Sequence, residues 1–285
     1  PSGHLVDTFV YDNFSSPATQ NMGDYRYDGT DYYYVNYAEG IYVGYKYYET
    51  RYEDVVCSRP EVGTYDYAST VLYPFGYGLS YTSFVWSNFE MTEADADGNI
   101  TVSLDVFNNG DRRGKEVVQV YVQSPYTDYD VKNGVEKSSV VLVGFAKTDY
   151  IEPQGTANVE ITVNLRDFTS YDANGAKTYI LEQGNYYVTA ASDAHRAVNN
   201  ILTARAEAGD TSVDTNKMTA AGDASFVGTF EQAQTDKTTY AATVSGEGTV
   251  TNLFDGAKLT DTPYLSRSKW SVMENNGLRY GTPSS

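Results

Sequence analysis

The chain has 285 residues and a mass of 31.5 kDa, a length that suggests about two domains. It carries 38 Asp and Glu against 20 Lys and Arg, for a formal net charge of −18, and so acidic a surface repels phosphate backbones. No apolar run approaches the roughly 20 residues needed to span a bilayer, and one cysteine with two histidines provides neither an internal disulfide nor a zinc site. We therefore expect no nucleic-acid partner, no membrane span, no metal and no cofactor.

The first residues, Pro-Ser-Gly-His-Leu-Val-Asp, contain neither the basic nor the apolar region of an export signal. A turn-forming start of this kind is typical of the interior of a protein, so we expect the chain to be part of a longer one. The single cysteine fits a reducing cytoplasm and also an exported bacterial protein. The compartment is therefore left open between the cytoplasm and a bacterial cell surface.

Tyrosine is unusually frequent, with 28 residues, more than half of them between Tyr25 and Tyr81. A tyrosine ring is apolar and its hydroxyl is polar, so such a stretch suits either a packed interface or a sugar-stacking surface. We favour interface packing, because amphipathic aromatic residues are common at interfaces generally.

The first part of the chain, up to about residue 79, has few periodic segments. The run from Gly40 to Tyr45 predicts a strand, and Asp28-Gly29 and Arg59-Pro60 predict turns. These signals are too few for a self-sufficient α/β domain.

From Thr82 to Glu207 apolar and polar residues alternate strictly, which is the period of a strand with one buried face. The alternation occurs in the runs 99–108, 115–124, 156–165 and 184–192. Turn dipeptides such as Asn109-Gly110 separate the runs. About seven short strands at this spacing predict an antiparallel β-sandwich of the immunoglobulin or fibronectin type III kind. Without a Cys pair or the buried-Trp spacing, the fibronectin type III-like form is expected.

From Ala208 onward the composition shifts to Thr, Ala, Gly and Asp. A segment of this kind has little core of its own, so we expect an extended connector.

Several long motifs occur in a familiar order. EGIYVGYKYYET (Glu39 to Thr50) and YPFGYGLSYTSF (Tyr73 to Phe84) resemble the end of the C-terminal α/β-sandwich domain of glycoside hydrolase family 3, the family of many β-glucosidases. NNGDRRGKEVVQVYVQSPY and LVGFAKTDYIEPQGTANVEITVNLRDFTSYD resemble the fibronectin type III-like domain of that family. SDAHRAVNNILTARA, NLFDGAKL and YLSRSKW resemble the variant with reversed domain order, whose catalytic (β/α)8 barrel comes last.

This resemblance implies a mainly β chain with three parts. Residues 1–81 would be the C-terminal part of the α/β-sandwich domain, residues 82–207 the fibronectin type III-like domain, and residues 208–285 a connector towards a catalytic barrel. The implied partners are that barrel, the remaining α/β-domain segments and a β-linked oligosaccharide or glucoside.

Retaining glycosidases need two carboxylates about 5 to 5.5 Å apart. The resemblance implies a nucleophilic Asp on the barrel and an acid/base Glu upstream of Pro1, and the chain matches neither motif, so we assign no catalytic residue. The expected role is a non-catalytic segment that scaffolds a β-glucosidase-like enzyme hydrolysing terminal β-linked sugars from oligosaccharides. The alternatives are a free-standing carbohydrate-binding β-sandwich without hydrolytic activity and a purely structural spacer.

Other groups give weaker signals. The acids Glu49, Glu53, Asp54 and Glu61 are interpreted as a solvated surface, because 38 acids make clusters inevitable. Ser-His-Asp catalysis is not indicated, since His4 and His195 lie on turn-like segments with no nucleophile elbow near them. Both histidines are expected at the surface. The run Glu93 to Ile100 resembles half of a calcium loop, but it lacks the closing Glu, and Asp97-Gly98 between alternating strands favours a hairpin turn.

The loop LYPFGYGLSYT holds the only candidates for substrate contact. Tyr73, Phe75 and Tyr77 supply rings that could border a sugar-binding cleft, and Gly76 and Gly78 permit tight backbone paths. The favoured interpretation is that the rings lock the α/β part onto the sandwich, because such a junction needs buried aromatic residues.

Overall fold

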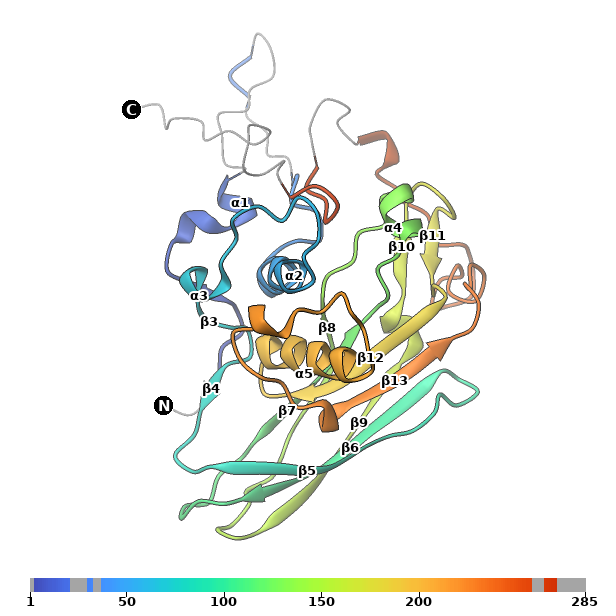
Figure 1. Cartoon of the computed structure of the whole chain (residues 1–285). Coiled ribbons are helices and arrows are strands. Elements are labelled where there is room, and N and C mark those ends of the chain that lie inside the picture. Colours follow the sequence, from blue (N-terminus) through green and yellow to red (C-terminus); the bar gives the residue numbers. More distant parts are fainter. Residues whose placement is uncertain (1–2, 21–29, 33–36, 258–263, 271–285) are drawn as a thin grey trace.

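The computed structural model describes residues 3–20, 30–32, 37–257 and 264–270, and two antiparallel sheets packed face to face dominate it (Figure 1). One sheet has the order β13-β12-β7-β8 and the other the order β5-β6-β9. These strands are β5 (Phe84–Met91), β6 (Asn99–Asn108), β7 (Val117–Gln123), β8 (Val141–Lys147), β9 (Thr156–Asn164), β12 (Gly184–Ala191) and β13 (Val227–Gln232). The predicted mainly β class with a fibronectin type III-like sandwich is confirmed.

The alternating pattern of the sequence builds the core between the two sheets. In β6 every second side chain, from Ile100 to Val106, is buried, while the intervening ones are partly exposed. Val118, Val120 and Val122 of β7 join this core from the opposite sheet. Each of the four predicted runs forms a strand in this sandwich, because a period of two places one apolar face against the other.

The outer face of the four-stranded sheet is also covered. Helix α5 (Ala194–Glu207) lies across it, next to β12 and β7 (Figure 1). The polar residues of β7 are therefore buried beneath the helix, and hydrogen bonds satisfy them: Gln119 donates to the carbonyl of Ser192 at 2.6 Å, and Tyr121 donates to Gln119 at 2.6 Å. Both faces of β7 are thus used for packing.

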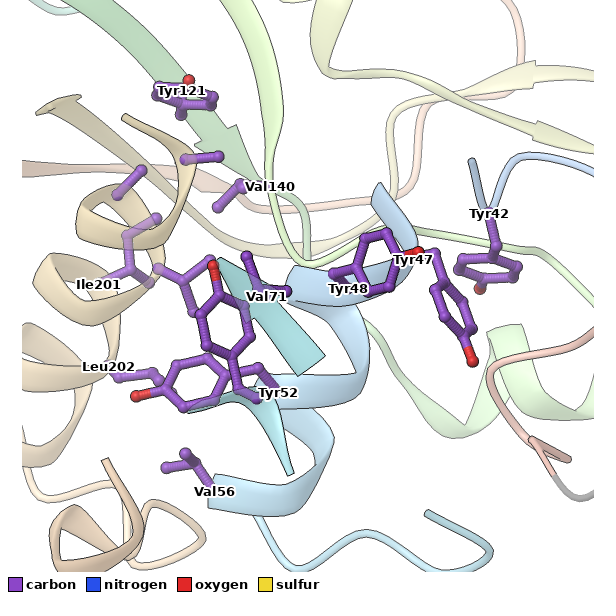
Figure 2. Close-up of a cluster of buried hydrophobic side chains, with 14 of the residues drawn as sticks. Tyr42, Tyr47, Tyr48, Tyr52, Val56, Val71, Tyr121, Val140, Ile201 and Leu202 are labelled. Carbon is purple, nitrogen blue, oxygen red and sulfur yellow. The ribbon is translucent and has the colours of Figure 1, made fainter. Parts of the chain in front are cut away.

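Helix α2 (Tyr45–Val56) packs on α5 and closes a second core, which is rich in tyrosine. Figure 2 shows Tyr47, Tyr48 and Tyr52 on α2, together with Ile201 and Leu202 of α5. For these buried tyrosines, the interpretation as interface packing is confirmed.

The strand predicted from Gly40 to Tyr45 is wrong. Gly40 and Gly44 both have positive φ, at 56° and 53°, so the backbone turns twice, and α2 begins directly at Tyr45. Glycine thus ends the extended run that the alternating Ile41 and Val43 suggested.

Short elements complete the fold. The paired strands are β1 (Gly3–His4) with β4 (Gly78–Leu79), β2 (Phe9–Val10) with β3 (Val71–Tyr73), and β10 (Ser170–Asp172) with β11 (Thr178–Ile180). The short helices are α1 (Pro17–Gln20), α3 (Tyr67–Thr70) and α4 (Asp128–Asn133), with 3-10 turns at Asn13–Ser15, Leu165–Phe168, Thr215–Lys217, Ala224–Phe226 and Asp255–Ala257. None of the described helices is long and apolar enough to cross a bilayer.

The hairpin predicted at Asp97-Gly98 is confirmed. β5 and β6 pair antiparallel around it, and Gly98 takes a positive φ of 79°. The side chain of Asp95 accepts hydrogen bonds from the backbone amides of Asp97 and Asn99, at 2.9 and 2.8 Å. This carboxylate thus organises the turn.

The segment after α5 returns to the sandwich. β13 pairs with β12 and forms the edge of the four-stranded sheet. Leu181 and Asp236 form a further bridge, and Tyr240 packs into the core between the sheets. Part of the segment with connector-like composition is therefore built into the β-sandwich.

Candidate functional site

The acidic residues of α2 point inward. Glu49, Glu53 and Asp54 have at most 2% of their surface exposed, whereas Glu61, beyond the helix, is exposed. The interpretation of a solvated acidic surface is therefore wrong for the three helical acids. The reason is that basic groups from distant parts of the chain meet them inside the protein.

Arg267 is the centre of this buried network. Its guanidinium donates to Asp54 Oδ1 at 2.9 and 2.7 Å and to Glu53 Oε2 at 2.8 Å. The indole of Trp270 donates to the other oxygen of Asp54 at 2.8 Å. We call residues 264–270, which supply both side chains, the clasp segment. The clasp segment is thus fixed to α2 by charge and hydrogen bonding.

Arg205 ties Glu53 to α5. It donates to Glu53 Oε1 at 2.7 Å and to Asp210 Oδ2 at 2.9 and 2.8 Å. Burial alone would raise the pKa of Glu53, but Arg267 and Arg205 outweigh burial and lower the pKa to about 2. Glu53 is therefore ionised and bound on both oxygens by arginine.

These contacts decide what the acids can do chemically. A retaining glycosidase needs one free carboxylate as nucleophile and one carboxylic acid as proton donor. Glu53 and Asp54 offer neither, because arginine and tryptophan donors occupy their oxygens. The neighbouring Cys57 is not an alternative nucleophile, because burial raises the pKa of its thiol to about 11.

Glu49 belongs to a separate chain of hydrogen bonds. His195 Nδ1 lies 2.8 Å from Glu49 Oε2, and His195 Nε2 lies 2.6 Å from the hydroxyl of Thr219. The ring of Tyr67 stacks on His195 at 3.9 Å and its hydroxyl donates to Glu49 at 2.6 Å. The hydroxyl, imidazole and carboxylate follow the order of a catalytic triad.

This chain of bonds is better explained by packing. Thr219 lines none of the grooves described below, and its backbone amide donates to the hydroxyl of Tyr52 at 2.9 Å. His195, at the start of α5, and His4 both have partly exposed side chains.

A second buried charge cluster holds α4 against the sandwich. Lys137 donates to Glu182 Oε2 at 2.6 Å, to Asp130 Oδ2 at 3.0 Å and to the carbonyl of Pro125 at 2.8 Å. Burial raises the pKa of Asp130 to about 7, although Lys137 opposes the shift. Two buried acids therefore share one ammonium group.

Two of the three predicted substrate-contact residues lie together at the surface. The rings of Tyr73 and Tyr77 stack at 5.0 Å with an angle of 23° between them. With Leu5, Phe9 and Leu79 they line an open, mainly apolar groove of about 330 Å³. A ring pair that is partly exposed beside an apolar groove can stack on a sugar ring.

Phe75 lies elsewhere. Its ring packs on Tyr45 at 4.7 Å, at the border of the second core. Gly76, next to it, has a positive φ of 86°, and a side chain there would collide with Gln119. The loop therefore turns Phe75 towards the protein interior and Tyr73 and Tyr77 towards the groove.

No cluster of three or more His, Cys, Asp or Glu side chains suited to a metal ion occurs within the described residues.

Comparisons with known proteins identify a domain family and similar enzymes. Residues 116–194 match the family model of the fibronectin type III-like domain. A β-glucosidase from Ruminococcus albus is 35% identical over 201 residues, which is 69% of this chain and 18% of the relative. β-Glucosidase A from Butyrivibrio fibrisolvens is 34% identical over 203 residues, 66% of this chain and 21% of the relative.

Solved structures of β-glucosidases are also similar to this chain. A β-glucosidase from Paenibacillus barengoltzii matches with a TM-score of 0.53 and 32% identity, covering 68% of this chain and 18% of that one. β-Glucosidase 3B from Thermotoga neapolitana, in complex with glucose, matches with a TM-score of 0.55 and 26% identity, covering 83% and 25%. This chain carries the fibronectin type III-like domain of the family 3 β-glucosidases. It spans about a fifth of the length of the curated relatives that it matches.

In this family 3 segment, sequence reasoning missed the basic partners. Arg267 meets an acid 213 positions away, and no local pattern connects them. Helix α5 did leave a signal: Asp193 caps it by accepting from the amide of Arg196, and Val198, Ile201 and Leu202 follow a helical period.

Replacing Arg267 by Met should lower the free energy of unfolding by about 3 to 5 kcal/mol, because it leaves the buried Asp54 without its cation. Urea unfolding measures the change. Arg112→Met, at an exposed position, is the matched control and should change little. Adding Asp54→Leu to Arg267→Met should recover part of the loss. If Arg267→Met were as stable as the parent, the stabilising role of the buried ion network would be contradicted.

Stability should also depend on pH through Asp130. Because its folded-state pKa is raised to about 7, the folded state retains a proton that the unfolded chain releases. The free energy of unfolding should fall as pH rises from about 4 to about 7, by on the order of 1 to 3 kcal/mol. Asp130→Asn should remove this part of the dependence in denaturant titrations at several pH values. An unchanged pH profile in Asp130→Asn would contradict the assignment.

Proposed function

We propose that this chain is a non-catalytic segment of a retaining family 3 glycoside hydrolase that removes terminal β-linked sugars from oligosaccharides. The observation that carries the proposal is the match of about two thirds of the chain to β-glucosidases at about a third identity. The structure of α2 supports the non-catalytic part, because the acids that lie close together there are bound by arginine, tryptophan or histidine.

The proposed division of labour follows the sequence. Residues 1–81 belong to an α/β-sandwich domain, and residues 82–207 form the fibronectin type III-like domain, to which β13 adds an edge strand. The rest of residues 208–285 leads towards a catalytic barrel. In this arrangement the chain braces the catalytic parts, and the barrel and the other α/β segments are its partners. The clasp segment gives the brace a rigid point, since Arg267 and Trp270 fix it to α2.

The substrate in this proposal is a β-linked oligosaccharide or glucoside. Tyr73 and Tyr77 are the residues proposed to approach it, because they are stacked beside an apolar groove. Phe75 contributes indirectly, by holding the loop against Tyr45.

The second candidate is a free-standing carbohydrate-binding β-sandwich without hydrolytic activity. The same ring pair favours it, since Tyr73 is 40% exposed and Tyr77 is partly exposed, and such a pair can bind a glycan without any catalytic group.

The first test is hydrolysis of an aryl β-glucoside by this 285-residue chain, beside a longer protein that continues through the following barrel. Only the longer protein should cleave, because the two carboxylates of the reaction are proposed to lie outside this chain. Turnover by the short chain alone would overturn the proposal. Glycan binding by both proteins with hydrolysis by neither would favour the second candidate.

The second test separates the aromatic residues. Tyr73→Ala and Tyr77→Ala in the longer protein should raise KM several-fold, since an aromatic contact is worth about 0.5 to 1.5 kcal/mol beyond its buried area. Phe75→Ala should lower thermal stability instead. Tyr179→Ala, which breaks another surface ring pair with Tyr171, is the control and should leave KM unchanged. Unchanged KM in both groove variants would exclude these tyrosines from substrate contact.

A further inference from the structure

A second pocket adjoins the aromatic groove at the β1–β4 pair. It has a volume of about 360 Å³ and is bounded by Gly3 and Gly78, by the loop before β7 and by the end of β8. The two sites share Gly3, Gly78 and Leu79 in their walls. Figure 1 shows the strands that build it, at the end of the sandwich near β4.

The lining of this pocket is basic, in contrast to the chain as a whole. Arg113, Lys115 and Lys147 line it, although the protein carries a net charge of −18. In the described part of the chain, Arg113 and Lys147 have no carboxylate within ion-pair distance. Lys115 has one, Asp149 at 3.5 Å, whose side chain is fully exposed, and a pair so open to solvent contributes little. The cations are therefore available to a ligand.

Tyr150 arranges two of these cations without neutralising them. The guanidinium of Arg113 lies 4.9 Å and the ammonium of Lys115 lies 5.0 Å from the centre of its ring. The backbone holds this group in place, since Gly114 and Ile151 exchange hydrogen bonds at 3.2 and 2.8 Å. An aromatic ring attracts a cation but has no net charge, so it leaves the positive field of the cation in place. A carboxylate would cancel that field.

One acid also lines the pocket. Glu116 is partly buried, accepts from the backbone amide of Val117 at 2.8 Å and has His4 Nε2 at 3.9 Å. Burial raises its pKa. Glu116 weakens the positive field of the pocket only in part, because Arg113, Lys115 and Lys147 outnumber it in the lining.

The positive charge of the pocket suits an anionic group, and the size and the uncharged lining residues indicate which kind of molecule carries that group. A volume of about 360 Å³ is at the lower end of pockets that hold small organic molecules. Tyr81, which is 68% exposed, presents a ring, and Ser80 and Ser192 present hydroxyl groups. A second groove of about 360 Å³, with Trp86, Arg196 and Asp223 in its lining, adjoins at Glu116 and Ser192. Rings, hydroxyls and room for further units suit a saccharide.

We propose that this basic pocket binds an acidic saccharide, a sugar that bears a carboxylate or a phosphate. Arg113 and Lys147 pair with the anionic group, Lys115 supports them, and the sugar ring lies on Tyr81. The anion preference rests on the charges of the pocket alone, whereas the sugar preference also rests on the proposed function.

Calorimetric titration of the chain at about 20 mM NaCl tests this. The probes are the disaccharide of glucuronic acid β-linked to glucose, its neutral analogue cellobiose, glucose 6-phosphate and inorganic phosphate. At least one acidic sugar should bind at least tenfold more tightly than cellobiose and than inorganic phosphate. Raising the salt to about 200 mM should weaken that binding several-fold, since exposed charges are screened.

A matched pair of variants locates the site. The double variant Arg113→Gln/Lys147→Gln should weaken binding of the acidic sugar at least tenfold. The control Lys132→Gln/Lys217→Gln removes the same charge at exposed positions outside the pocket and should retain the affinity of the parent. Circular dichroism verifies that both variants are folded.

Each other outcome overturns a defined part of the proposal. Equal binding of cellobiose would overturn the anion preference, and equal binding of inorganic phosphate would overturn the sugar preference. Equal weakening in both double variants, or no binding of any acidic sugar, would overturn the site. The β-glucosidase proposal is tested separately, on neutral glucosides and at Tyr73 and Tyr77, so that its failure is distinguishable from failure here.

Discussion

Two adjacent carboxylates buried on α2, Glu53 and Asp54, hold the α-helical half of this protein together. Their arginine partners come from α5 and from the clasp segment, so three distant parts of the chain meet at one point. A buried ion pair of this kind adds little net stability over well-packed apolar residues, because desolvation opposes the attraction. Its main effect is to specify how α2, α5 and the clasp segment are arranged. If one partner were displaced, the other would remain as a buried, unpaired charge. The position of α2 over α5 is thereby fixed more closely than tyrosine packing alone would fix it.

The same constraint extends into the β-sandwich. α5 covers the outer face of β7 and β12, so the side chains of β7 are buried on both sides of the sheet. Gln123 accepts from Arg205 at 3.1 Å on that covered face, which connects the ion network to the sheet itself. A strand with polar residues on its second face would normally be solvated there. Here the helix replaces the solvent, and the network holds the helix in place.

The sequence predicted the sandwich well because its information is local. In β6, a period of two from Ile100 to Val106 decides both the strand and its buried face. The helical half depends on long-range contacts instead. The acids of α2 are indistinguishable from a solvated run until Arg205 and Arg267 are placed beside them. The run from Gly40 to Tyr45 also misled, because alternation suggests a strand even where two glycines adopt positive φ and turn the chain.

The candidate sites were also predictable to different degrees, because part of their geometry is local in sequence and part depends on long-range contacts. The ring-rich loop marked Tyr73 and Tyr77, but their separation from Phe75 depends on the backbone turn at Gly76 and on Gln119 beneath it. The basic pocket left no sequence signal, since Lys147 is brought opposite Val117 by strand pairing. Strand register thus gathers charges that composition hides, and a chain with a strongly negative average can still present a local positive field. Attraction of an anion depends on that local field within about 8 to 10 Å, because salt screens the more distant charges.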